Sequence, residues 1–271
     1  MPLSRLALNL ITAGTSHSFE SLLNACVDHG IQTVSPWQEH YALIGATQAA
    51  SLLRKRSITV NTVCRMTGFG PAVSATSWQQ AIDDAHRLID EAATLGARSI
   101  TVVGGGSGPS GDLAGARDRI VQGVAQVLPA ARAAGVVLAL EPLHPMVAAE
   151  RGAINTLEQA VRYAGQLGEG VGVMVDAYNS WWDPALAKSI AAAGGRIAGL
   201  QISDWLIPTN DLAFDRGLPG EGVIDLPAVR GLVERAGYSG DIEIEVLSAN
   251  WSGRALDELL PAVVGSFTRH C

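Results

Sequence analysis

Residues 136–176 read VVLALEPLHPMVAAERGAINTLEQAVRYAGQLGEGVGVMVD and contain one full copy of the pattern that decides the fold. The first run, VVLALE, is short and apolar, as in a buried strand. Residues 155–167 then place apolar side chains at helical spacing. A second apolar run, VGVMVD, follows at 171–176. This order of strand, helix and strand predicts a parallel βαβ unit.

The same alternation extends along the whole chain, with about 30 residues in each unit. Strands are expected at residues 6–10, 31–36, 57–63, 98–103, 136–141, 171–176, 196–202 and 241–247. Helices are expected at residues 18–29, 44–55, 77–96, 113–134, 155–167, 184–194, 226–236 and 254–267. Eight such units in 271 residues predict a single α/β domain over residues 1–271, folded as a (β/α)8 TIM barrel, for which roughly 250 residues are typical.

A doubly wound parallel sheet is the competing interpretation of this pattern. That fold usually has fewer strands and a glycine-rich turn after the first one. The segment after the first expected strand here, TAGTSHS at 12–18, lacks that turn. The sequence therefore favours the barrel.

Composition narrows the class of protein. Hydrophobic residues make up 48% of the chain and charged residues 17%, as in ordinary globular proteins, and no apolar run reaches the roughly 18 residues of a membrane span. The net charge of −7, without a dense basic run, argues against nucleic-acid binding. The N-terminus lacks the pattern of a signal peptide. The three cysteines show no metal-site spacing, so we expect a reduced, cytoplasmic protein.

Polar side chains end four consecutive strands of the expected barrel, where the active sites of this fold lie. A buried carboxylate needs a counter-charge, hydrogen bonds or a metal ion. For any one of these residues a buried ion pair with an arginine is the simpler explanation, but three carboxylates around one axis favour a divalent cation. On the last strand, Glu243 and Glu245 share a face, and Glu245 is preferred because it lies nearer the carboxyl end. The four residues are Glu141, Asp176, Gln201 and Glu245.

Several motifs occur in order around these residues: EPLHP at 141–145, VDAYNSWWDP at 175–184, QISDWLIPTNDLAFDRGLPGEGVIDL at 201–226 and IEIEVLS at 242–248. Together they resemble the sugar phosphate isomerase/epimerase group of the xylose-isomerase-like TIM barrel superfamily, over essentially the whole chain. This resemblance implies a metal-dependent enzyme with one divalent cation, for which Glu141, Asp176, Gln201 and Glu245 would be the ligands.

The resemblance also implies a mechanism. Glu141 and Glu245 would stand on opposite faces of the substrate, so that one removes a proton next to a carbonyl group and the other returns a proton to the opposite face. The metal would polarise the carbonyl and stabilise the enediolate. His144, three residues after Glu141, is expected to contact a substrate hydroxyl or act as an acid.

Two residues depart from the family pattern. Gln201 stands where relatives usually have a histidine ligand. Because a carboxamide oxygen is a poorer Zn²⁺ ligand than imidazole, we expect Mn²⁺ or Mg²⁺, with Co²⁺ or Zn²⁺ as the remaining candidates. Asn179 stands where many relatives have another histidine, which indicates a different substrate or a weakened activity.

Further residues near the expected barrel mouth are candidates for binding a small sugar or keto-sugar. Trp37 offers a flat face for a sugar ring, while Arg65 and Arg216 suit a substrate oxygen or carboxylate. Asn9 and Asn179 are candidates for polar contacts. No nucleic-acid or membrane partner is expected, and a homodimer is expected only because apolar barrel surfaces often associate.

Two other functions remain open at this point. A lyase on the same scaffold, such as a keto-inositol dehydratase or an enzyme that eliminates from 3-keto-glycosides, begins with the same proton abstraction but expels a leaving group. A non-catalytic sugar-binding subunit is the third interpretation, and Gln201 and Asn179 are the residues that keep it open.

Overall fold

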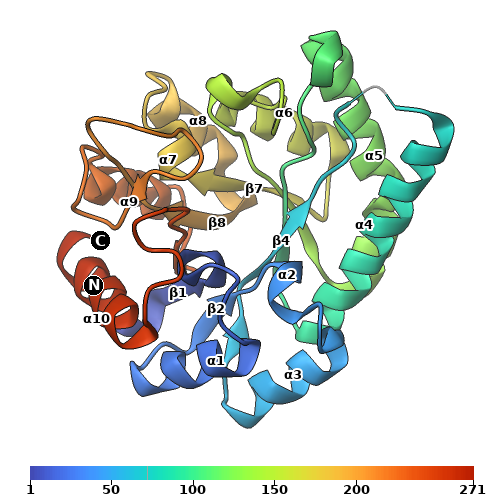
Figure 1. Ribbon diagram of the computed structural model, residues 1–271. Coiled ribbons are helices and arrows are strands. Elements are labelled where there is room, and N and C mark those ends of the chain that lie inside the picture. Colours follow the sequence, from blue (N-terminus) through green and yellow to red (C-terminus); the bar gives the residue numbers. More distant parts are fainter. Residues whose placement is uncertain (72) are drawn as a thin grey trace.

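A ring of parallel strands forms the centre of the computed structural model, which describes residues 1–71 and 73–271 (Figure 1). Within these residues the parallel sheet runs in the order β3-β2-β1-β11-β8-β7-β6-β5-β4. Its strands are β1 (Leu6–Asn9), β2 (Thr33–Ser35), β3 (Thr59–Val60), β4 (Thr62–Met66), β5 (Ser99–Val102), β6 (Val137–Leu140), β7 (Val171–Asp176), β8 (Ile197–Ile202) and β11 (Ile242–Ile244).

The ring closes through the third expected strand, which Asn61 divides into β3 and β4. Strand β3 pairs with β2, and β4 pairs with β5. A bridge between Trp37 and Cys64 adds a further link across this point. The predicted (β/α)8 barrel is therefore confirmed.

Helices surround the strands on the outside of the ring (Figure 1). They are α1 (Phe19–Asp28), α2 (Gln38–Tyr41), α3 (Gly45–Lys55), α4 (Ala75–Leu95), α5 (Leu113–Ala134), α6 (Leu157–Leu167), α7 (Ala177–Ser180), α8 (Leu186–Ala193), α9 (Leu226–Arg235) and α10 (Leu256–His270). Short 3-10 turns lie at Leu3–Arg5, Leu10–Ala13, Gly108–Ser110, Pro145–Val147 and Gly194–Arg196. No helix in the described part of the chain combines the length and apolarity that crossing a bilayer requires.

Local signals in the sequence fix the ends of these helices. The Ser18 and Asp225 side chains accept hydrogen bonds from backbone amides of the first turns of α1 and α9, which satisfies donors that a helix start leaves free. Gly96 and Gly135 end α4 and α5 in the left-handed conformation, with φ of 70° and 69°, which glycine adopts at little cost. Helix α4 starts at Ala75, slightly before the predicted start at residue 77.

The segment after β8 contains a small hairpin that the sequence pattern does not predict. Strands β9 (Asp204–Trp205) and β10 (Arg216–Gly217) pair antiparallel, with Arg216 opposite Trp205. Arg216 is thereby held next to the carboxyl end of the barrel strands.

Candidate active site

Three carboxylates converge at the carboxyl ends of the barrel strands. Glu141 follows β6, Asp176 ends β7 and Glu245 follows β11. Oxygens of the three side chains lie within 4.8 Å of one another, and all three residues are buried. This spacing would allow one cation to contact all three.

Gln201, on β8, is the fourth candidate ligand. It is fully buried and lies in register with Asp176 of β7 and Glu243 of β11. Its amide nitrogen donates to Glu243 Oε1 at 2.9 Å, while its amide oxygen has no partner among the described residues. A buried oxygen without a donor costs about 1–3 kcal/mol, and a bound cation would remove that cost. The donor set therefore fits a hard divalent metal ion.

Glu243 is the centre of a hydrogen-bond network inside the barrel. Its Oε1 accepts from Asn9 Nδ2 at 2.8 Å and from Gln201, and its Oε2 accepts from the Ser35 hydroxyl and from Asn61 Nδ2 at 2.9 Å. These four donors fill the four lone-pair positions of an ionised carboxylate. Burial raises the pKa of Glu243, and the hydrogen bonds oppose this rise.

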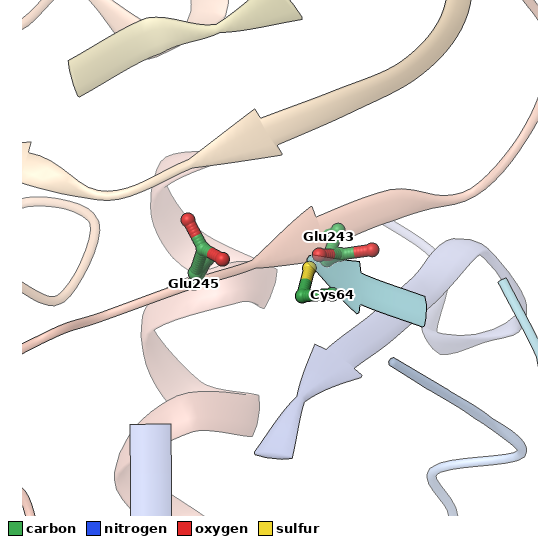
Figure 2. Close-up of side chains that lie close together, drawn as sticks. All are labelled: Cys64, Glu243 and Glu245. Atoms are coloured by element: carbon green, nitrogen blue, oxygen red, sulfur yellow. The ribbon is translucent and has the colours of Figure 1, made fainter. Parts of the chain in front are cut away.

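Cys64 forms a second group of potential ligands with Glu243 and Glu245. Figure 2 shows the thiol of Cys64, on β4, beside the carboxylate of Glu243, with Glu245 further along the same chain segment. Because all lone-pair positions of Glu243 are already used, we assign no ion to this group. Burial raises the pKa of the Cys64 thiol, so the sulfur stays protonated and unreactive.

Arg216 supplies a positive charge inside the carboxylate cluster. It is buried, and its Nη1 lies 3.0 Å from Asp176 Oδ2 and 3.2 Å from Glu245 Oε2. Its guanidinium also stacks over the Tyr178 ring at 4.4 Å. Burial lowers the pKa of Arg216, but the carboxylates outweigh this effect and raise it overall. The arginine stays charged and offsets part of the repulsion among the acids.

Asn179, on α7, joins two of the acids to the loop after β6. Its Nδ2 donates to Glu141 Oε1 at 3.1 Å and to Asp176 Oδ2 at 2.5 Å, and its Oδ1 accepts from the His144 backbone amide at 3.1 Å. These contacts hold the Glu141 carboxylate and the His144 loop in a fixed relation to each other.

The surroundings of the two glutamates raise the pKa of both carboxyl groups. Burial raises the pKa of Glu245 to about 8, although Arg216 opposes the rise. Burial and the charges of Glu245 and Asp176 raise the pKa of Glu141 well above its ordinary value. A pKa near neutrality, such as that of Glu245, suits general acid–base catalysis.

A cavity of about 140 Å³ opens beside Glu141 and Glu245. Drug-sized pockets run to roughly 300–1,000 Å³, so this cavity suits a ligand smaller than a typical drug molecule. Its walls include most of the side chains predicted to bind substrate, together with His144, whose pKa burial lowers. Those predicted residues are Trp37, Arg65, Asn179 and Arg216.

Asn9, also predicted to contact substrate, is fully buried and is not among the described residues that line the cavity. Its Nδ2 donates to Glu245 Oε1 as well as to Glu243, both at 2.8 Å. Asn9 therefore orients Glu245 rather than facing the cavity. The roles assigned to the other residues stay predictions.

The sequence interpretation missed Arg151 and did not place Cys64 at the cavity wall. Arg151 lies in the loop after β6, ten positions beyond Glu141, where no periodic pattern indicates the direction of a side chain. The only available signal was that this loop follows a strand whose carboxyl end bears a candidate ligand.

The chain that carries this site matches a known protein family. Residues 23–262 match the family described as xylose isomerase-like TIM barrel. The chain belongs to this family. The resemblance inferred from the motifs is thereby confirmed, and the candidate ligands lie within the matched residues.

Several solved structures share the fold of this member of the xylose isomerase-like TIM barrel family. The Sinorhizobium meliloti 1021 protein SMc04130 is 44% identical, covers 100% of this chain over 99% of its own, and superposes with a TM-score of 0.96. The IolI protein with a bound zinc atom is 19% identical, with 97% of this chain and 96% of that chain covered and a TM-score of 0.84.

D-psicose 3-epimerase from Clostridium cellulolyticum H10, solved with D-tagatose, is 16% identical, with 97% of both chains covered and a TM-score of 0.79. At such low identity this likeness and that to IolI concern the fold alone. No curated protein matches the chain.

Proposed function

We propose that the protein is a divalent-metal-dependent enzyme that isomerises or epimerises a small sugar or keto-sugar by moving a proton next to a carbonyl group. One observation carries the proposal: Glu141 and Glu245 both line the same small cavity and both belong to the carboxylate cluster. Each glutamate has two oxygens, so one can bind a cation while the other faces a substrate carbon.

Glu141, Asp176, Gln201 and Glu245 would hold the cation, and their all-oxygen donor set favours Mn²⁺ or Mg²⁺. When bound, the cation would polarise the substrate carbonyl and stabilise the negative charge of the enediolate. The unpartnered oxygen of Gln201 supports this assignment.

Proton transfer would be the task of the two glutamates. They follow β6 and β11, which β7 and β8 separate in the ring, so they approach a substrate from different sides. One takes the proton from the carbon beside the carbonyl, and the other returns a proton to that carbon or its neighbour. In the metal-free site the pKa of Glu141 is raised and that of Glu245 is raised to about 8, so both carboxyl groups retain a proton more readily than an exposed glutamate does. His144, at the cavity wall, would donate to a substrate oxygen.

The comparisons add general support. The fold is shared with a D-psicose 3-epimerase and with a zinc-bound IolI protein, which are an enzyme for a ketose and a metal-binding protein of the same architecture.

Solvent deuterium exchange tests the proposal. The Mn²⁺-loaded protein is incubated in D2O with ketoses such as D-fructose and D-tagatose and with keto-inositols, and NMR follows the proton next to the carbonyl. We expect deuterium at that carbon and formation of an isomer or epimer. Glu141→Gln and Glu245→Gln should abolish the exchange, whereas Glu150→Gln, an exposed residue of the cavity rim, should retain it.

The other outcomes are equally informative. Accumulation of a product that has lost water or an aglycone would contradict the proposal and would identify the protein as a lyase that uses the same site. Failure to bind Mn²⁺ or any other divalent ion would replace it with a sugar-binding protein.

A further inference from the structure

Among the residues that the structure describes, three arginines face the candidate cavity, and one of them has a carboxylate partner. Arg65, Arg151 and Arg216 all line the cavity wall. Arg216 is paired with Asp176 and Glu245. Arg65 and Arg151 form no ion pair within residues 1–71 and 73–271.

Both unpaired arginines are half-buried, which is an unusual place for a free guanidinium. Burial and the positive charges of Arg216 and Arg65 lower the pKa of Arg151, although Glu141 and Glu245 oppose this. Glu150, the other acid at the rim, is exposed and forms no ion pair with either arginine in the described part of the chain. Positive charge is therefore in surplus on this side of the cavity.

Arg65 is held in an orientation that leaves its donors free. Its guanidinium lies over the Trp37 ring, 4.4 Å from the ring centre. This stacking uses the flat face of the guanidinium, and the N–H groups in its plane remain available for a bidentate contact.

The topology separates Arg65 from two of the candidate cation ligands. Arg65 belongs to β4, which is separated from β7 and β8, the strands of Asp176 and Gln201, by β5 and β6. Arg151 lies in the loop after β6. A substrate in the cavity would meet Glu141 and Glu245 and also the two arginines, because all four line the same wall.

From these observations we infer that Arg65 and Arg151 form a subsite for an anionic group of the substrate, a carboxylate or a phosphate. The inference rests on the proposed function and narrows it: the substrate is a small sugar acid or sugar phosphate rather than a neutral sugar. The paired Arg216 and the acids around it leave these two guanidiniums as the groups that would neutralise such an anion.

Calorimetric titration of the Mn²⁺-loaded protein tests this inference with ligands matched in carbon skeleton. D-Gluconate is compared with sorbitol, and D-fructose 6-phosphate with D-fructose. We expect at least one anion to bind at least tenfold more tightly than its neutral counterpart, and the anion that does so identifies the group. Arg65→Gln and Arg151→Gln should each lower the affinity for that anion by roughly 10- to 100-fold, the range for hydrogen bonds to charged groups. Neither change should alter the affinity for the neutral ligand.

Arg54→Gln is the matched control, because Arg54 is exposed on α3 and is absent from the cavity wall; it should bind as the unmodified protein does. Equal affinity for anionic and neutral ligands, or no binding of either anion, overturns the inference. So does an anion whose binding is lost on metal removal but unchanged in both arginine variants, because it would then sit on the cation. These readouts do not require turnover, so an anion preference without deuterium exchange would contradict the proposed reaction and leave the subsite standing.

Discussion

The Gln201 amide nitrogen donates to Glu243 across 2.9 Å, and this contact decides which end of the Gln201 amide is free. An ionised carboxylate only accepts hydrogen bonds, so the NH2 group must face Glu243. The oxygen is then left as the free end of a fully buried side chain. Glu243 thus acts as a positioning residue for the candidate ligand Gln201. It stands two residues before Glu245, another candidate ligand.

Glu243→Gln tests this positioning. The new NH2 group would meet one of four donors head-on, so we expect the free energy of unfolding to fall by about 1–3 kcal/mol and the Mn²⁺ affinity to fall about 10- to 100-fold. Chemical denaturation and competition with a chelator measure the two effects. Asn61→Ala is the control, because Asn61 donates to the other oxygen of Glu243; it should lower stability and keep the metal affinity. Unchanged metal affinity in Glu243→Gln would limit Glu243 to a structural role.

Gln201→His tests the fourth ligand. Imidazole is a better ligand for Zn²⁺ and Co²⁺ than a carboxamide oxygen, so we expect both ions to bind more tightly and the absorption spectrum of the Co²⁺-loaded protein to change. Chelator competition and visible spectroscopy check this. An affinity and a spectrum that match the unmodified protein would show that residue 201 does not contact the ion.

Arg216→Met tests how the site is neutralised. Removing one partner of a buried ion pair costs about 3–5 kcal/mol, so the metal-free variant should unfold at a much lower temperature. Added Mn²⁺ should restore more stability to the variant than to the unmodified protein, because the cation would replace the lost charge among Asp176, Glu245 and Glu141. Thermal melts with and without Mn²⁺ measure this. A deficit that Mn²⁺ leaves unchanged would argue against a cation at this position.

Metal affinity should depend on pH. Since the pKa of Glu245 is raised to about 8 without metal, a proton competes with the cation below that pH, and affinity should fall as the pH is lowered from 9 to 6. The sign for stability is opposite in the metal-free protein. The folded state keeps the proton up to about pH 8, whereas the unfolded chain releases it near its ordinary, lower value, so stability falls as pH rises through this window. Titrations and melts at several pH values check both trends; a pH-independent affinity would contradict the assignment of Glu245.

The barrel was predictable because each buried parallel strand is a short apolar run followed by a helical pattern. The four candidate ligands followed from the fold, since parallel strands bring their carboxyl ends to one side of the ring. The third strand was less well predicted: it was expected at residues 57–63, and it extends to Met66 with a break at Asn61. A polar residue inside an apolar run does not say which neighbour each half will pair with.

The hydrophobic pattern of the sequence could not predict the contacts around the candidate ligands. The hairpin of β9 and β10 consists of two-residue strands, which are too short to show periodicity, yet it brings Arg216 into the cluster. The donors to Glu243 come from four different strands or strand junctions, and only tertiary packing decides that they meet. The prediction that residues 1–271 form one domain, and those about partners, remain predictions.

Strand β1 pairs with β11 in register, Leu8 beside Ile244, and this pairing joins the first strand of the chain to the last. During translation β1 is synthesised long before β11. Asn9 therefore lacks its hydrogen-bond partners Glu243 and Glu245 until the ribosome has reached those residues. The cluster around Glu245 can therefore assemble only after β11 and Glu245 have been synthesised, and a nascent chain would not capture a metal ion at this place before then.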